Sequence, residues 1–353
     1  MANGIHVTDP SIRLILTGSC QSGCSFCHLE GNRPSGYYGL HPDISGWKEK
    51  DPKLPLLQRL AYAANDEDVQ FVIKICKILK IRKVHLTGGE PTLHPKIVKF
   101  IKLFKESGIH TAVTTHGEYP AERLISMLKA GIDSIIFSLH CINEEEYLTT
   151  DLIAQQIEEK FGLDKSMVYA CTRLQMKKKN IELSMLHARK TESFEVAANN
   201  VIRDSSTSIA VIRYCNELGL TIRLQKEMNK PWESEKIISE IVSVLNAKKF
   251  STSTSFDDSS RGGIDYKYKM NNGQYGLFKV KEFAPAYLQS ICESCRLRGT
   301  PKCRERFYGV RVQRGHVRLC IDKHDEKVLY TFQDFLNNKN GIVDGLKRQY
   351  NVA

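Results

Sequence analysis

Three cysteines stand close together near the start of the sequence, in the segment GSCQSGCSFCHLEG at residues 18–31. Cys20, Cys24 and Cys27 are separated by three and then two residues, so one compact loop can present all three thiolates. Thiolates bind soft metals and iron–sulfur clusters, whereas a closed zinc site requires four ligands, and only His28 could join the three thiols. A cubane has four irons, so three thiolates leave one iron able to bind the amino and carboxylate groups of an external molecule. A zinc or 2Fe–2S site is the alternative.

A second group of cysteines lies toward the end of the chain, in the segment ICESCRLRGTPKCRERFYGVRVQRGHVRLC. Its members are Cys292, Cys295, Cys303 and Cys320. A CxxC pair with two further thiols can hold a tetrahedral zinc, and the same set can hold a second iron–sulfur cluster. The other cysteines are isolated and are interpreted as inert buried thiols. They are Cys76, Cys141, Cys171 and Cys215.

Alternating strand and helix patterns must position these residues. Buried strands are expected at residues 12–17, 83–89, 110–117, 133–140, 193–202 and 220–227. Helices are expected at residues 69–80, 95–108, 122–131, 207–219 and 234–249. The alternation predicts an α/β protein with a parallel sheet covered by helices, in which chemistry takes place at the carboxyl ends of the strands. The cysteine loop follows the first strand, GGEP follows the second and TTHG ends the third, so the three motifs meet at that edge.

Two stretches do not fit the simple alternation. Residues 141–192 are longer than a crossover requires and are interpreted as an insertion. Residues 251–263, STSTSFDDSSRGG, are polar and predict a flexible boundary. The expected division is therefore a core at residues 1–250 and a C-terminal extension at residues 251–353.

The composition describes a chain that can bury a core and that carries excess positive charge. Of its 353 residues, 41% are hydrophobic, and the formal net charge is +11. The sequence has neither a run of eighteen apolar residues nor an apolar signal core, which predicts a cytoplasmic protein without a membrane span. Eleven cysteines in such a chain indicate metal or redox chemistry rather than disulfides. Basic runs such as MKKKN at residues 176–180 are interpreted as solvated faces, and charge alone does not select a partner.

The motif Cys20-x3-Cys24-x2-Cys27, with Phe26 before the last cysteine, resembles the signature of radical S-adenosylmethionine (SAM) enzymes. The resemblance implies a 4Fe–4S cluster whose open iron holds the methionine end of SAM. An electron from that cluster cleaves SAM and releases a 5′-deoxyadenosyl radical, which abstracts a hydrogen from the substrate. The implied electron donor is a flavodoxin- or ferredoxin-type protein. The implied fold is a partial (β/α)6 TIM-like barrel with a C-terminal cluster-binding extension.

The segment LTGGEP resembles the glycine-rich element of the same family. The resemblance implies that Gly88 and Gly89 let the backbone approach the amino group of SAM and that Glu90 accepts a hydrogen bond from it. Thr115 and Ser138 fall where the family places its ribose and methionine contacts.

The C-terminal cysteines are similar to those of the GTP cyclase family of molybdenum-cofactor biosynthesis. That family binds an auxiliary 4Fe–4S cluster through three cysteines, a pattern that Cys292, Cys295 and Cys320 match. Basic positions that match its substrate-binding residues are Arg13, Lys83, Arg296 and Arg298. Guanidinium groups suit phosphate oxygens, while a salt bridge at the barrel rim is the alternative for Arg13 and Lys83.

Several positions depart from the cyclase pattern. His85 stands where the cyclase has a second basic residue, no asparagine follows the CxxC pair, and the sequence ends in RQYNVA in place of a Gly-Gly tail. These departures put the GTP cyclisation itself in doubt. The loop to Cys320 is also longer and contains Cys303. If Cys303 binds the second cluster, no open iron remains there for a substrate.

The sequence therefore predicts a radical SAM enzyme that abstracts hydrogen from a small polar substrate, with phosphorylated or nucleotide-like compounds as the candidates. A peptide-modifying maturase is the alternative within the same class. The alternative from another class is a zinc-binding, nucleic-acid-binding protein, which the basic charge permits. Neither a basic stripe with interleaved aromatic residues nor a zinc-finger helix supports nucleic-acid binding.

Overall fold

The computed structural model describes residues 9–24, 26–27, 63–227, 230–258, 261–283, 288–293, 295–296, 298–300, 303, 309–313, 315–320 and 328–350. His28, considered above as a fourth ligand, lies outside the described residues. Within the described part of the chain, no helix combines the length and the apolar character needed to cross a membrane.

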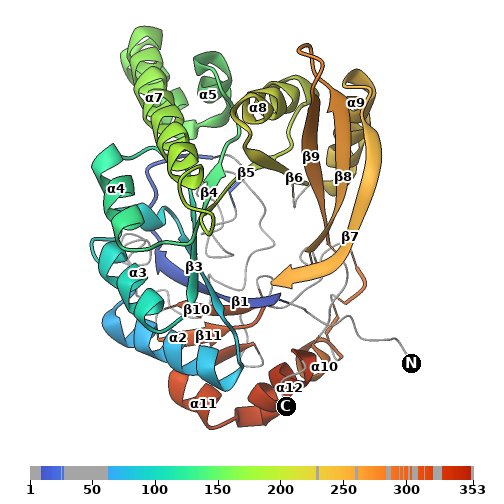
Figure 1. Ribbon diagram of the computed structural model, residues 1–353. Helices are drawn as coiled ribbons and strands as arrows, with labels where there is room; N and C mark the ends of the chain where they lie inside the picture. The colour runs from blue at the N-terminus through green and yellow to red at the C-terminus, as the bar shows by residue number, and fades with distance from the viewer. Residues whose placement is uncertain are drawn as a thin grey trace.

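Six parallel strands form the centre of the molecule, as the sequence predicts. They are β1 (Asp9–Thr17), β2 (Lys83–Gly88), β3 (His110–Thr115), β4 (Ser134–Ser138), β5 (Glu195–Val201) and β6 (Thr221–Gln225). Each pairs in parallel with the next. The connecting and flanking helices are α2 (Asp66–Ile78), α3 (Ile97–Glu106), α4 (Ala121–Lys129), α8 (Ser205–Leu218) and α9 (Pro231–Val244). Figure 1 shows these helices around the outside of the curved sheet, which confirms the predicted partial (β/α)6 barrel.

The two faces of each strand have different environments. Successive side chains of a strand point to opposite faces. In β2, Val84 and Leu86 belong to the buried apolar cluster that the outer helices cover, whereas His85 and Thr87 line the interior of the barrel. In β6, Arg223 lines the same interior. Because these inward positions are polar, the barrel interior is a polar cavity rather than a filled apolar core.

Three antiparallel strands close the sheet. They are β7 (Lys248–Asp258), β8 (Arg261–Lys269) and β9 (Tyr275–Phe283). β9 pairs with β6, and β7 pairs with the start of β1 at Asp9 and Pro10, so the sheet returns to its first strand. Figure 1 shows the end of β7 beside β1.

The structure corrects the expectation of a flexible segment at residues 251–263, because its described residues lie in β7 and β8. Ladder hydrogen bonds satisfy the backbone of a strand whether its side chains are polar or apolar. Thr252, for example, lies opposite Ile264. The division of the chain near residue 250 stays a prediction.

The stretch at residues 141–192 forms three helices between β4 and β5. They are α5 (Glu144–Thr150), α6 (Leu152–Phe161) and α7 (Leu163–Ala188). The basic run at residues 176–180 is only partly a solvated face. Lys179 is exposed, but Lys177 is 4% exposed because its ammonium group pairs with the buried carboxylate of Glu118.

The C-terminal region adds to the same sheet. Its elements are α10 (Gln289–Cys292), β10 (Val310–Gln313), β11 (His316–Arg318), β12 (Leu329–Thr331), α11 (Phe332–Leu336), η4 (Lys339–Gly341) and α12 (Ile342–Gln349). β10 runs parallel to β1, with Ile12 opposite Val310. The edge of β1 that faces away from β2 is therefore shared between β7 and β10.

Candidate functional site

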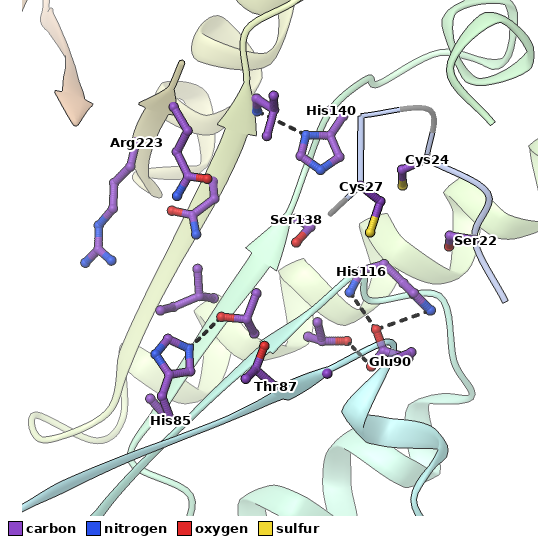
Figure 2. Close-up of a pocket in the computed structure, with 18 of the residues that line it drawn as sticks. Ser22, Cys24, Cys27, His85, Thr87, Glu90, His116, Ser138, His140 and Arg223 are labelled. Carbon is purple, nitrogen blue, oxygen red and sulfur yellow. Dashed lines mark hydrogen bonds and ion pairs between the residues drawn. The ribbon is translucent and has the colours of Figure 1, made fainter. Parts of the chain in front are cut away.

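A cavity of about 280 Å³ occupies the barrel interior and extends to the carboxyl ends of the strands. Its lining includes the three N-terminal cysteines and most of the predicted cofactor and substrate residues. The predicted residues in the lining are Cys20, Cys24, Cys27, Arg13, Lys83, Gly88, Gly89, Glu90, Thr115 and Ser138. Figure 2 shows Cys27, Ser138 and Glu90 around the same space.

The cysteine loop continues directly from β1. The amide of Cys27 donates to the carbonyl oxygen of Cys24 at 3.1 Å, which turns the loop back on itself. Desolvation, with the neighbouring thiols of Cys27 and Cys20, raises the pKa of Cys24 above its ordinary value. The positive charge of a bound metal is what favours the thiolate over the thiol in such a site.

Gly88 and Gly89 bring the end of β2 against the start of the cysteine loop. The amide of Gly89 donates to the carbonyl oxygen of Thr17 at 2.7 Å, and the amide of Glu90 donates to that of Ser19 at 2.8 Å. A Cβ atom on Gly88 would lie 2.3 Å from the Thr17 oxygen, and one on Gly89 would lie 2.3 Å from the Ser19 oxygen. The glycines are therefore required for this backbone approach, whatever contact they make with SAM.

The Glu90 side chain is 1% exposed and bonds to its own chain. It caps the short helix η3 (Pro91–Leu93) by accepting from the amide and hydroxyl of Thr92 at 3.0 and 2.6 Å. It also accepts from the hydroxyl of Thr115 at 2.7 Å and the amide of His116 at 2.9 Å. Because a carboxylate has about four acceptor positions, these donors account for most of its capacity. Glu90 and Thr115 thus tie the ends of β2 and β3 together, and their contacts to SAM stay predictions.

His140 is a site residue that the sequence reasoning did not single out, although it follows Ser138 in the motif FSLH. Its Nδ1 accepts a hydrogen bond from the amide of Val201 at 3.1 Å, and its ring packs edge-on against Phe26 at 4.6 Å. Burial, together with Lys177 and other nearby cations, lowers the pKa of His140 to about 3. The ring is therefore neutral with its proton on Nε2, and His140 lines the cavity as a hydrogen-bond donor.

Basic side chains line the barrel interior. Arg13 and Lys83, both predicted, lie in the lining with His85, whose Nε2 is 2.6 Å from the Thr114 hydroxyl oxygen. Arg223 and Lys281 are further lining residues that the sequence reasoning missed; they come from β6 and β9. Arg223 stands between two buried aliphatic residues in TIRLQ, and this alternation is the signal that places it on the inner face.

Arg223 has neither a hydrogen-bond nor an ion-pair partner among the residues that the structure describes. Figure 2 shows it across the cavity from Cys24. Arg296 and Arg298, also predicted to contact substrate, lie on exposed turns beside Cys295, outside the described lining of the cavity. Their predicted role stays a prediction.

The C-terminal cysteines are half-buried. Burial, with smaller contributions from the nearby thiols of Cys320 and Cys295, raises the pKa of the Cys292 thiol to about 11. The Cys292 thiol, at the end of α10, therefore lies within electrostatic reach of Cys295, three residues on, and of Cys320, which follows β11. Cys303 lies in a turn in which its amide donates to the carbonyl of Thr300 at 3.1 Å.

A three-cysteine loop after the first strand of a partial (β/α)6 barrel, packed against a glycine-rich turn in the lining of one cavity, defines the class of this protein. Residues 14–174, which include the cysteine loop and the glycine-rich turn, match the sequence model of the Radical SAM superfamily, so this part of the chain is a radical SAM enzyme core. Its cofactors are a 4Fe–4S cluster and SAM.

Two proteins with distant sequence similarity to this chain are both named as probable GTP 3′,8-cyclases. The probable GTP 3′,8-cyclase of Thermococcus kodakarensis is 32% identical over 137 residues, which are 39% of this chain and 37% of that protein. The probable GTP 3′,8-cyclase of Saccharolobus islandicus is 30% identical over 137 residues, 38% of this chain and 36% of that protein. The chain therefore spans just over a third of the length of these relatives.

Among solved structures, anSMEcpe with bound AdoMet resembles this chain with a TM-score of 0.51. The likeness covers 97% of this chain and 84% of that one at 13% sequence identity. At this identity it shows the fold alone, a mixed sheet of radical SAM type with a C-terminal extension.

The donor set fits a 4Fe–4S cluster with three protein ligands. In the part of the chain that the structure describes, no three Cys, His, Asp or Glu side chains converge closely enough to hold a single metal ion. A closed zinc site requires such convergence. In a cubane, each thiolate binds a different iron, so the sulfur atoms remain apart. Cys20, Cys24 and Cys27, all in the lining of one cavity, supply the three thiolates that such a cluster requires.

Proposed function

We propose that this enzyme abstracts a hydrogen atom from a small anionic substrate, of phosphorylated or nucleotide-like type, bound inside the barrel. The observation that carries the proposal is one cavity lined both by the three cysteines and by a set of basic side chains. The lysines and arginines of the lining are Arg13, Lys83, Arg223, Lys226 and Lys281. Its glutamates are Glu90, Glu195 and Glu227, so the lining carries excess positive charge.

The basic residues differ in how available they are to a ligand. Lys226 bonds to Glu235 and Glu282 at 3.1 and 3.0 Å, so part of its charge is already paired. Arg223 is the better candidate for a phosphate contact, because a planar guanidinium can donate two parallel hydrogen bonds to phosphate oxygens. Arg13 and Lys83 extend the same surface along β1 and β2.

When bound, the reduced cluster supplies the electron that cleaves SAM at its sulfonium. Within the proposal, Cys20, Cys24 and Cys27 hold that cluster. Ser138 and His140 line the same cavity and are the residues proposed to donate hydrogen bonds to SAM.

Cys292, Cys295 and Cys320 are proposed to bind an auxiliary 4Fe–4S cluster. Support comes from the electrostatic interaction of the Cys292 thiol with the thiols of Cys320 and Cys295. In this proposal, Cys303 is either a fourth ligand of the auxiliary cluster or not a ligand at all, and mutation of Cys303 distinguishes the two cases. A flavodoxin- or ferredoxin-type protein is the proposed electron donor.

The test is anaerobic reconstitution with iron and sulfide, followed by addition of SAM and dithionite. The enzyme is expected to form 5′-deoxyadenosine, and Cys24→Ser is expected to abolish it, while Cys171→Ser, a cysteine outside the described lining, retains it. Failure of the cluster-loaded wild type to form 5′-deoxyadenosine rejects the proposed chemistry.

The substrate class is tested separately with deuterated GTP and with a synthetic peptide. Transfer of deuterium from GTP into 5′-deoxyadenosine supports a nucleotide-like substrate. If SAM cleavage is normal and only the peptide transfers its label, the anionic substrate is wrong and the maturase alternative stands.

A further inference from the structure

The α5–α7 insertion contacts the cysteine loop through the backbone of Gly23. The Gly23 amide donates to Oδ2 of Asp151 at 3.0 Å, and the Leu152 amide donates back to the Gly23 carbonyl at 3.0 Å. Cys24 and Asp151 form an isolated antiparallel bridge. A Cβ atom on Gly23 would lie 2.8 Å from the amide nitrogen of Ile153, so glycine is required at this contact. Asp151 is also the N-cap of α6, which fixes its side chain.

A second contact between the insertion and the loop is built on the buried carboxylate of Glu118, in the turn after β3. Arg173 on α7 donates to Glu118 Oε2 through Nε at 2.8 Å, and its Nη2 is 2.7 Å from the same oxygen. Lys177, one turn further along α7, lies 2.8 Å from Oε1. Tyr147 on α5 donates its hydroxyl to Oε2 at 3.0 Å.

The cysteine loop is bonded to the same group. The Ser22 hydroxyl donates to Glu118 Oε2 at 3.2 Å, and the Gln21 side chain donates to the Glu118 carbonyl oxygen at 2.7 Å. The carbonyl oxygen of Gln21 in turn accepts from Nη2 of Arg173 at 3.1 Å and from the hydroxyl of Tyr169 at 3.3 Å. Arg173 therefore bonds to the buried carboxylate and to the backbone of the loop with one guanidinium group.

The charges of this network favour a single arrangement. Burial acts to raise the pKa of Glu118, but Lys177, His116 and Arg173 hold it well below its ordinary value, so the carboxylate is ionised. Removing one partner of such a buried set leaves the others without compensation. Two cations, Arg173 and Lys177, therefore face the one carboxylate of Glu118.

We propose that helices α5–α7 clamp the three-cysteine loop in its cluster-binding conformation and that Arg173 is the positioning residue which couples Glu118 to that loop. The inference rests on the proposed role of Cys20, Cys24 and Cys27 as cluster ligands. It assigns a function to an insertion that lies outside the barrel strands.

The test compares Arg173→Met with Arg173→Lys. A lysine retains the positive charge opposite Glu118 but lacks the planar fork that reaches the Gln21 carbonyl at the same time. The matched control is Lys179→Met, an exposed position on the same helix. Hydrogen exchange of the amides at residues 20–24 reports on the loop backbone. Electron paramagnetic resonance of the reduced cluster, with and without SAM, reports on the ligand geometry.

Both Arg173 variants are expected to exchange these amides about tenfold faster, because a charge-assisted hydrogen bond to the loop is lost. Both are also expected to show an altered SAM-dependent resonance, while Lys179→Met matches the wild type. If Arg173→Lys restores wild-type exchange and resonance, charge alone is sufficient and the positioning role is overturned.

A second pair of variants covers the case in which Arg173→Met does not fold. Asp151→Ala removes the other contact with Gly23, and Asp164→Ala, at an exposed position of α7, is its control. Faster exchange of the Gly23 amide in Asp151→Ala alone supports the clamp, and equal exchange in both variants contradicts it. Absence of a SAM-dependent resonance in the wild type would reject the cluster assignment, and the exchange data would still decide whether the insertion holds the loop.

Discussion

Gly89 and Ser19 approach so closely that a single methyl group on Gly89 would lie 2.3 Å from the Ser19 carbonyl oxygen. The contact joins the end of the second barrel strand to the first residues of the cysteine loop. The neighbouring amide of Glu90 donates to the same oxygen at 2.8 Å. The position of the loop is therefore set by backbone packing as well as by its cysteines.

We predict that Gly89→Ala lowers the free energy of unfolding by about 1–3 kcal/mol, the usual cost of overpacking, and lowers the iron bound per chain. Gly108→Ala is the control. Gly108 has a φ of +69° and no heavy atom within 4 Å of an added Cβ. Gly108→Ala therefore measures the cost of backbone strain alone, about 1 kcal/mol, without a steric clash. Denaturant unfolding and iron analysis measure both effects. Equal iron content in the two variants would argue that the Ser19 contact does not position the loop.

Arg223→Met is predicted to weaken the binding of GTP by about tenfold or more, because a charged donor to phosphate is lost. Arg213→Met, at an exposed position on α8, should leave binding unchanged. Isothermal titration calorimetry with GTP, and with tripolyphosphate as a base-free probe, measures the change. A loss with GTP but none with tripolyphosphate would place Arg223 at the base or the sugar rather than at the phosphates.

The barrel strands and their order could be predicted from the sequence because each strand has a local pattern of buried and polar residues. The closing strands could not. The segment STSTSFDDSS has little apolar character, and only pairing with β8 and with the start of β1, more than 240 residues earlier, makes it a strand. Such long-range pairing leaves no local signal.

The candidate site could likewise be predicted only in part from the sequence. Cys20, Cys24 and Cys27 are close in sequence, so their spacing predicted one loop, and the structure places all three in the lining of one cavity. The partners Glu118 and Arg173 are 55 residues apart, and neither lies in a motif. A buried ion pair is visible only once α7 is packed against the turn after β3. The basic run that contains Lys177 therefore looked like a solvated surface.

Mutation of the C-terminal cysteines is predicted to remove the proposed auxiliary cluster and to leave the cluster of the N-terminal loop in place. Cys292→Ser and Cys320→Ser should each lower the iron content from about eight to about four per chain, since 4Fe–4S clusters need their thiolate ligands. SAM cleavage should decrease less than iron content, because the N-terminal loop is intact. Cys303→Ser decides between the two ligand sets: unchanged iron indicates three cysteine ligands, and a loss equal to that of Cys320→Ser indicates four.

His94 should make the protein less stable in acid. Its Nε2 lies 2.9 Å from the carbonyl oxygen of Ala64, its Nδ1 accepts from the amide of Lys96, and burial lowers its pKa. Below about pH 6.5 the unfolded chain therefore binds a proton that the folded chain does not, so the free energy of unfolding falls by up to about 1.4 kcal/mol per pH unit. Urea unfolding at pH 7.5 and 5.5 should show a smaller pH effect in His94→Gln. An equal decrease in both proteins would assign the effect to other groups.

The outer edge of β1 is shared by β7 at Asp9–Pro10 and by β10 at Ile12–Leu14. Among the strands that the structure describes, β1 is synthesised earliest, yet its neighbours on that side are synthesised only after about residue 248 and about residue 310. During most of translation, the strand that leads into the cysteine loop has an unpaired edge, which is a template for wrong pairing. A cluster delivered during translation would therefore meet a sheet in which β1 is not yet fully paired. This topology favours insertion of the cluster after the chain has left the ribosome.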